Sequence, residues 1–271
     1  MTEEELMLSS LLDCRRIDLY VDPKPLSLRQ EKKLIQMQLR RRQGEPLQYI
    51  VGSVEFMGLN FVVDSRVLIP RPETEILLER VLTLAQQLRS PHLRILDLGT
   101  GSGNIAISLA KFIDSSSVTA IDISPEAIEL AKMNVKNHSV ASKINFIHTD
   151  MIEYLSHYRA EEEPFDILVS NPPYIPCAQI HRLPKDVQCE PRIALDGGED
   201  GLHFYRSIIE RAPFILKRGG YLVLELGDGQ KVVLEELLAN SPGYQEINFY
   251  KDYCGIDRVL VAKVTNENQP N

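Results

Sequence analysis

The chain has 271 residues, of which 44% are hydrophobic and 25% are charged, as in ordinary globular proteins. Its formal net charge of −8 disfavours proteins that bind nucleic acid mainly through phosphates, because these usually carry a positive balance. No signal peptide or stretch long enough to span a membrane is evident, and the four cysteines lack zinc spacing, so we expect a cytoplasmic protein with free thiols and no metal site.

Residues 1–82 are expected to form a first unit, a small helical domain followed by a linking β-hairpin. Leucines at helical spacing predict a short helix over residues 6–12, and a longer amphipathic pattern predicts a second helix over 28–42. Residues 49–69 alternate loosely between apolar and polar types, which predicts a hairpin around Gly58.

Residues 83–265 are expected to form a second unit, in which apolar strands alternate with helices. This order is typical of a mostly parallel, doubly wound α/β sheet, and such sheets bind ligands at the carboxyl ends of their strands. The predicted strands are 94–98, 117–121, 144–148, 166–170, 221–226 and 259–264, and the predicted helices between them lie near 104–113, 125–137, 200–217 and 229–240. A further predicted helix, residues 75–88, precedes the first of these strands. Residues 266–271 are expected to be a tail.

A glycine-rich turn follows the first strand of this sheet, with the sequence Gly99-Thr100-Gly101-Ser102-Gly103. Glycines at alternate positions let the backbone turn sharply and approach a ligand closely. A dinucleotide-binding fold prefers a glycine at position 104, where this chain has asparagine. The spacing is instead similar to motif I of class I methyltransferases, which bind S-adenosylmethionine; a tight turn without a ligand is the alternative.

Acidic residues end the next two predicted strands. Asp122 lies 19 residues after Gly103 and is predicted to accept hydrogen bonds from the ribose hydroxyls of an adenosyl group. Helix capping is the alternative role, but Ser124 is better placed for it. Asp150 and Met151 end the third strand, where this fold contacts adenine; Met151 is predicted to pack on the ring, and for Asp150 a helix N-cap is the alternative.

The most specific signal is Asn171-Pro172-Pro173-Tyr174, directly after the fourth strand. The prolines stiffen the backbone and remove two donors, which leaves the Asn171 side-chain oxygen and the Pro172 carbonyl as acceptors. Such a rim can take both hydrogens of one planar –NH2 group and direct the nitrogen lone pair toward a methyl donor, while Tyr174 stacks on the planar group. We predict Asn171, Pro172 and Tyr174 as catalytic, all four residues as substrate-binding, and Asn171 also as cofactor-binding. A turn or polyproline patch is the alternative.

A long loop, residues 171–199, contains five prolines and is expected to form an ordered lid or rim. With this loop the sequence resembles the HemK/PrmC-type release factor glutamine methyltransferases from about residue 40 to residue 264. The motifs that carry the resemblance are residues 42–52, Leu68 to Glu75, the glycine turn, Asp122, Asn171 to Tyr174, Glu190-Pro191 and residues 255–258.

The resemblance implies a class I (Rossmann-like) methyltransferase sheet with a small N-terminal helical domain and a linking β-hairpin. It implies S-adenosylmethionine as cofactor, with Gly99 to Gly103, Asp122, Met151 and Asn171 at the cofactor positions. It also implies methyl transfer to the side-chain amide nitrogen of the glutamine in the Gly-Gly-Gln motif of class-1 peptide chain release factors, which modulates translation termination. Residues 1–82 would recognise the substrate protein, and no membrane or direct nucleic-acid partner is expected.

Competing functions share parts of this pattern. An N6-adenine nucleic-acid methyltransferase also uses Asn-Pro-Pro-Tyr, but it must extract its base and should carry a basic recognition segment, which the sequence lacks. A nicotinamide oxidoreductase is disfavoured by Asn104. A non-catalytic binding module would be excluded by measurable methyl transfer.

Overall fold

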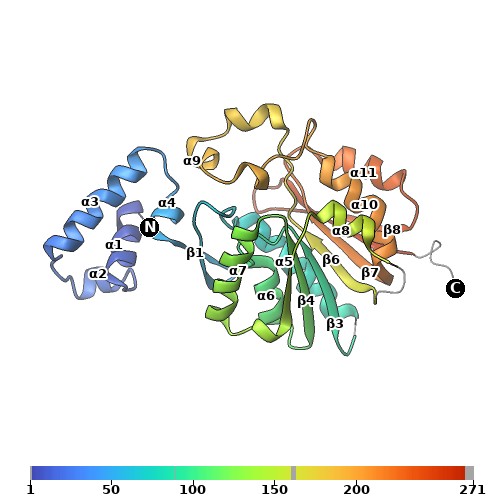
Figure 1. Cartoon of the computed structure of the whole chain (residues 1–271), viewed down its shortest axis with the longest axis horizontal. Helices are drawn as coiled ribbons and strands as arrows, with labels where there is room; N and C mark the ends of the chain where they lie inside the picture. The colour runs from blue at the N-terminus through green and yellow to red at the C-terminus, as the bar shows by residue number, and fades with distance from the viewer. Residues whose placement is uncertain (1, 89, 160–162, 266–271) are drawn as a thin grey trace.

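The computed structural model describes residues 2–88, 90–159 and 163–265. A helical lobe lies to one side of a larger α/β body, and the first hairpin connects the two (Figure 1). The expected tail, residues 266–271, lies outside the described residues. Among the helices that the structure describes, none is long and apolar enough to cross a membrane.

The lobe is built by short helices around a small core of its own. Met7, Met37 and Ile50 are buried together in this core. The predicted second helix begins at Ser27, whose side chain forms a capping box with Gln30. Within residues 2–52 the helices are α1 (Glu3–Leu12), α2 (Asp18–Val21), α3 (Leu28–Arg42) and α4 (Leu47–Val51).

The hairpin consists of β1 (Ser53–Phe56) and β2 (Leu59–Val62), which pair antiparallel as predicted. Its aromatic side chains, Phe56 and Phe61, are buried in the core of the body rather than in the lobe. The Asn134 side chain also bonds both the N–H and the C=O of Val62, at 2.8 and 3.0 Å. The hairpin is therefore anchored to the body.

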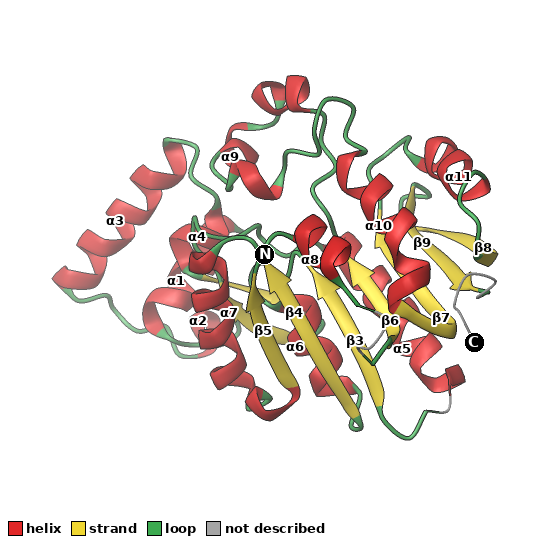
Figure 2. Ribbon diagram, turned by 45° about the vertical axis from the view of Figure 1, so that its right-hand side comes forward, coloured by secondary structure: helices red, strands yellow, loops and turns green. Residues whose placement is uncertain are grey.

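Over the described residues, seven strands form the main sheet in the order β5-β4-β3-β6-β7-β9-β8 (Figure 2). Strands β3 to β7 pair in parallel, and β9 pairs antiparallel with both β7 and β8. This arrangement confirms the predicted methyltransferase-type α/β sheet. The strands are β3 (Leu93–Leu98), β4 (Ser116–Asp122), β5 (Ile144–His148), β6 (Phe165–Ser170), β7 (Leu216–Glu225), β8 (Tyr244–Lys251) and β9 (Asp257–Val264).

Helices cover both faces of the sheet, so the central strands are apolar on both sides. One core contains Ile95 and Ile167 and is covered by α5 (Pro72–Leu88), α6 (Asn104–Phe112) and α7 (Pro125–His138). The other contains Leu96 and Leu168 and is covered by α8 (Met151–His157), α10 (His203–Ile215) and α11 (Lys231–Ala239).

The structure differs from the sequence-based expectation at two places. The expected boundary between residues 82 and 83 falls inside α5, and Leu77, Leu78 and Val81 of this helix are fully buried against the sheet. Strand β8 was not predicted, because most of its side chains are exposed and it lacks an apolar pattern.

Candidate active site

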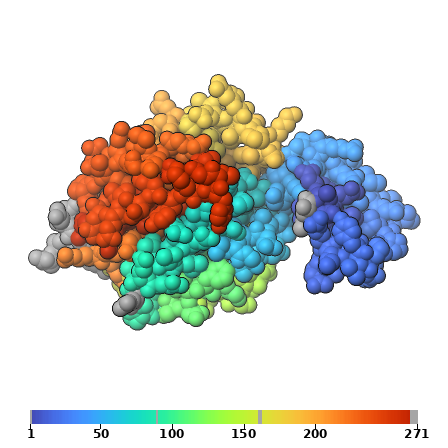
Figure 3. All heavy atoms as spheres, turned by 180° about the vertical axis from the view of Figure 1, so that it is seen from behind, coloured from blue at the N-terminus to red at the C-terminus, as the bar shows by residue number. Residues whose placement is uncertain are grey.

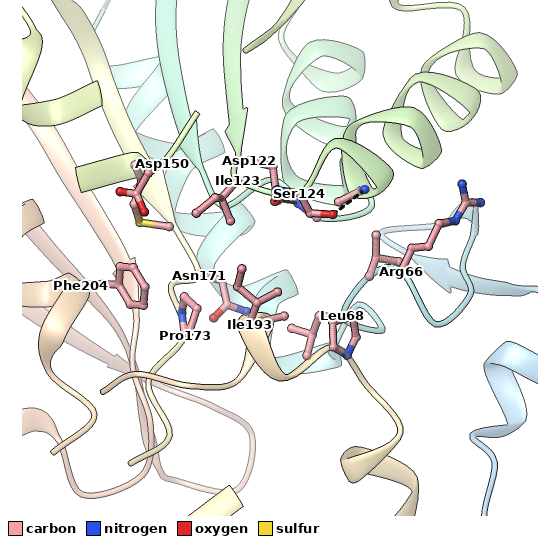
Figure 4. Close-up of a pocket in the computed structure, with 17 residues that line it drawn as sticks. Arg66, Leu68, Asp122, Ile123, Ser124, Asp150, Asn171, Pro173, Ile193 and Phe204 are labelled. Carbon is pink, nitrogen blue, oxygen red and sulfur yellow. Dashed lines mark hydrogen bonds between the residues drawn. The ribbon is translucent and has the colours of Figure 1, made fainter. Parts of the chain in front are cut away.

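A cavity lies at the carboxyl ends of the parallel strands, where open α/β sheets bind their ligands. We call it the glycine-loop cavity (Figure 4). Its lining side chains come from the turns after β3, β4, β5 and β6, from the segment before α5, from the loop after β6 and from α10. The lining residues are Arg66, Val67, Leu68, Gly99, Gly101, Asp122, Ile123, Ser124, Ala127, Asp150, Met151, Asn171, Pro173, Pro191, Ile193, Ala194 and Phe204.

The glycine turn is held against β4 by backbone hydrogen bonds. The N–H groups of Gly99 and Thr100 both donate to the Ile121 carbonyl at 2.9 Å. The Thr100 hydroxyl donates to the carboxylate of Asp97 at 2.7 Å, inside the protein. A Cβ added at Gly101 would meet no atom within 4 Å, so this residue faces open space beside the cavity.

Asp122 supports the turn and faces the cavity at the same time. One carboxylate oxygen accepts the N–H of Gly101 at 2.8 Å, and the other accepts the N–H of Ser124 at 2.9 Å. Burial raises the pKa of Asp122, while these backbone donors oppose the shift. Each carboxylate oxygen keeps lone-pair capacity for a hydroxyl donor from a ligand. Ser124 caps α7, as the sequence indicated.

The part of the wall that follows β5 and continues to α10 combines an acid, a thioether and an aromatic ring. Asp150 caps α8 through one oxygen, which accepts the N–H groups of Ile152 and Glu153 at 2.7 and 3.2 Å. The capping alternative is therefore realised, and Asp150 also lines the cavity. Met151 is 9% exposed, and Phe204 of α10 lies near Asp150 (Figure 4).

Asn171 lines both this cavity and a neighbouring one, which we call the Tyr174 cavity. Pro172, Tyr174 and Arg71 line the Tyr174 cavity, whereas Pro173 lines the glycine-loop cavity. Burial raises the pKa of the Tyr174 phenol, which keeps it neutral. A planar group in the Tyr174 cavity would thus lie beside Asn171 and across from a ligand in the glycine-loop cavity.

A segment that we call the lid, residues 175–199, supplies lining residues to both cavities. Its helical elements are short: η2 (Cys177–Arg182), α9 (Lys185–Gln188) and η3 (Arg192–Ala194). Figure 3 shows it in yellow above the body, next to the blue helical lobe. Glu190 is its buried anchor: it accepts the N–H of Ile69 at 3.1 Å and forms an ion pair with Arg71. The lid is thereby tied to the segment that precedes α5.

The backbone of Tyr174 is packed against two glycines, one near the end of the lid and one just after it. A Cβ at Gly197 would lie 2.7 Å from the Tyr174 Cα, and one at Gly201 would lie 2.4 Å from the Tyr174 carbonyl oxygen. Gly201 also has a φ of +78°, in the left-handed region. The Gln230 side chain donates to the same carbonyl at 3.1 Å. These contacts fix the position of Tyr174.

The sequence-predicted residues fall into three groups. Those that line the glycine-loop cavity are Gly99, Gly101, Asp122, Met151, Asn171 and Pro173. Those that line the Tyr174 cavity are Asn171, Pro172 and Tyr174. Thr100, Ser102 and Gly103 are not among the lining residues of either cavity, and they support the turn instead.

Several lining residues were missed by the sequence-based prediction. Leu68 reaches the site from the segment before α5, Phe204 from α10, and Ile193 from the lid, more than 20 residues after the end of β6. Leu68 lies within a stretch that the family resemblance had marked, and this was the only signal for it. Phe204 sits in an apolar helical pattern that indicates a core position equally well.

Comparison with known proteins identifies family models and relatives that match this chain. A family model described as "Methyltransferase domain" matches residues 89–263, and one described as "PrmC N-terminal domain" matches residues 2–52. A release factor glutamine methyltransferase of Geobacter sulfurreducens is 41% identical over 97% of this chain and 89% of the relative. One of Chlorobaculum tepidum is 41% identical over 94% of this chain and 87% of the relative. Among solved structures, a methyltransferase from Pyrococcus furiosus has a TM-score of 0.54 at 22% identity and covers 85% of this chain and 98% of its own, which shows the shared fold.

Proposed function

Because the chain belongs to the family of release factor glutamine methyltransferases, we propose that it transfers a methyl group from S-adenosylmethionine to the side-chain amide nitrogen of a release factor glutamine. The observation that carries the proposal is the position of Asn171, between a cavity suited to the cofactor and a cavity suited to a planar amide.

The residues of the glycine-loop cavity suit an adenosyl ligand. Asp122 offers acceptors for ribose hydroxyls, and Met151 and Phe204 offer apolar surface for a flat base. The open space beside Gly101 leaves room for the ligand to approach the backbone. We propose that these residues, with Gly99 and the glycine turn, hold the cofactor. When bound, S-adenosylmethionine supplies an activated methyl group on its sulfonium.

The chain's own residues position the substrate nitrogen. The Asn171 side-chain oxygen and the Pro172 carbonyl are proposed to accept the two hydrogens of the glutamine –NH2 group, since the prolines of the rim offer no competing backbone donors. Holding both hydrogens directs the nitrogen lone pair away from the amide plane. Tyr174 and the lid cover the group and exclude water, so positioning and electrostatics carry the rate.

The finer assignments rest on the family and on composition. We propose that the substrate is a class-1 release factor and that the glutamine belongs to its Gly-Gly-Gln motif. We also propose that the helical lobe, residues 2–52, contributes to substrate recognition and that the hairpin belongs to the catalytic body, because Phe56 and Phe61 are buried there. The four free cysteines and the acidic charge support a cytoplasmic protein that does not bind nucleic acid directly.

The test is the site of methylation. The purified protein, labelled S-adenosylmethionine and an intact release factor are incubated, and mass spectrometry locates the label. We expect it on the glutamine side chain, and a factor with that glutamine replaced by alanine should stay unlabelled. A single-stranded DNA oligonucleotide serves as the competing acceptor. Methyl groups on adenine, or on another residue of the factor, would overturn the substrate assignment.

A further inference from the structure

A buried hydrogen-bonded chain lies behind Asn171 and connects three elements. Thr74 of α5 is 1% exposed, and Glu225, the last residue of β7, is 2% exposed. The Thr74 hydroxyl donates to the Glu225 carboxylate at 2.6 Å. The Asn171 side-chain nitrogen donates to the Thr74 oxygen at 3.3 Å. Strands β6 and β7 are parallel neighbours, with Ser170 in register with Leu224, which brings Asn171 and Glu225 to the same edge of the sheet.

The chemistry of this chain fixes the direction of the Asn171 amide. An ionised carboxylate only accepts hydrogen bonds, so Glu225 takes the single hydrogen of the Thr74 hydroxyl. Thr74 can then only accept a bond from Asn171, and its partner must be the amide –NH2 rather than the carbonyl. The Asn171 carbonyl oxygen is left for the cavities that this residue lines.

We propose that Glu225 and Thr74 are positioning residues, which hold Asn171 with its side-chain carbonyl oxygen toward the substrate nitrogen. This inference rests on the proposed function, because an amide substrate brings two hydrogens that need acceptors. If Asn171 were turned over, its –NH2 would face the –NH2 of the substrate and two donors would oppose each other. The orientation of one buried amide therefore decides whether the rim accepts or repels the substrate.

Protonation of Glu225 would remove this constraint. Burial raises the pKa of Glu225 to about 7; the Thr74 hydrogen bond, the Arg258 charge and a hydrogen bond from the Asn171 side chain itself oppose the shift, and the Glu73 charge adds to it. The phenols of Tyr174 and Tyr205 also face this region, and Tyr205 donates to the Glu225 backbone carbonyl at 2.8 Å. A protonated Glu225 can donate to Thr74, which frees the Thr74 hydrogen to bond the Asn171 oxygen and lets the amide turn.

The kinetic test compares Thr74→Val, which keeps the shape of the side chain but lacks the hydroxyl, with Thr74→Ser, which keeps the hydroxyl. Thr83→Val on the same helix is the matched control, since the Thr83 hydroxyl is exposed and donates to the Glu79 carbonyl of its own helix. We expect Thr74→Val to lower kcat about ten- to a hundredfold, while its affinity for S-adenosylmethionine by calorimetry changes about twofold or less. Thr74→Ser should restore most of kcat.

The pH profile tests the role of Glu225. We expect kcat of the wild-type enzyme to rise with pH through about 7 and this limb to disappear in Glu225→Gln, which cannot ionise. A limb unchanged in Glu225→Gln would overturn the proposal, because it would then belong to another group such as Asp97. So would a Thr74→Val variant as active as the Thr83→Val control, or a Thr74→Ser variant as impaired as Thr74→Val.

A spectroscopic measurement separates this inference from the proposed function. In the ligand-free wild-type protein, the side-chain amide resonances of Asn171 should titrate with a midpoint near pH 7, and they should lose this titration in Glu225→Gln, which cannot ionise. Amide resonances that do not titrate in the wild type would overturn the positioning chain, whatever the acceptor of the methyl group. If the resonances titrate but the label is found outside glutamine, the positioning chain stands and the proposed function fails.

Discussion

Replacing Glu190 with alanine should loosen the lid more than any change at the lid surface. The Glu190 side chain is 1% exposed and the Arg71 side chain 31% exposed. The substitution leaves the buried N–H of Ile69 without its acceptor, which costs about 1–3 kcal/mol. Loss of the ion pair adds about 1–2 kcal/mol, less than for a fully buried pair because Arg71 reaches solvent.

The sum, about 2–5 kcal/mol, corresponds to an increase of about 30- to 5,000-fold in the equilibrium for opening the lid. Hydrogen exchange read by mass spectrometry over residues 175–198 measures this directly, since amides there exchange when the lid opens. Glu190→Gln keeps an acceptor for Ile69 and should show a smaller increase. Glu199→Ala, at an exposed position of the same segment, is the control.

The increase should be confined to the lid and the segment before α5, with the sheet core unchanged. The value of kcat/KM for an intact release factor should fall with it, because an open lid no longer covers the substrate amide. If exchange over residues 175–198 in Glu190→Ala matched that of Glu199→Ala, the assignment of Glu190 as the anchor would be wrong.

The remaining predictions concern the cofactor, the domain division and a buried acid. Asp122→Ala should weaken binding of S-adenosylmethionine about ten- to 150-fold, and unchanged affinity by calorimetry would contradict its assignment. A chain that begins at Ser53 should fold and bind cofactor yet fail to methylate an intact release factor. A chain that begins at residue 89 lacks α5 and should therefore show no cooperative unfolding transition. Asp97 has a folded-state pKa raised by burial to about 7. Its pKa in the unfolded chain is about 3.9, so the stability that Asp97 contributes to the wild type should fall as pH rises from about 4 to about 7. The gain in Tm of Asp97→Asn over the wild type should therefore be larger at pH 8 than at pH 4. An equal gain at the two pH values would argue against a buried, neutral Asp97.

The sequence predicted the parts of the fold that local patterns determine. The ends of α3 follow from Ser27 and the apolar spacing, and the buried parallel strands follow from continuous apolar runs. Strand β8 was not predicted because its stability comes from pairing with β9 rather than from an apolar pattern of its own. Its exposed side chains give no period of two.

The site divides in the same way. Asp122 and Asn171 were predictable, because the carboxyl ends of parallel strands meet at one edge and both residues follow such strands. The pairing of Thr74 with Glu225 was not, because 151 residues separate them and only the packing of α5 on β7 brings them together. The ion pair between Glu190 and Arg71 joins positions 119 residues apart, and the sequence around either residue does not predict this pairing.

The contacts of Gly197 and Gly201 with Tyr174 have a consequence for how this protein tolerates sequence change. A methyl group at either position would collide with the Tyr174 backbone, which cannot move aside as a flexible side chain could. In a deep mutational scan for methylation, these two codons should be depleted of every substitution, as strongly as Asn171. Intolerance at Gly197 and Gly201 would reflect the shape of the rim rather than contact with substrate. Such a scan would therefore mark the residues around the active site as essential without separating those that contact substrate from those that support the backbone.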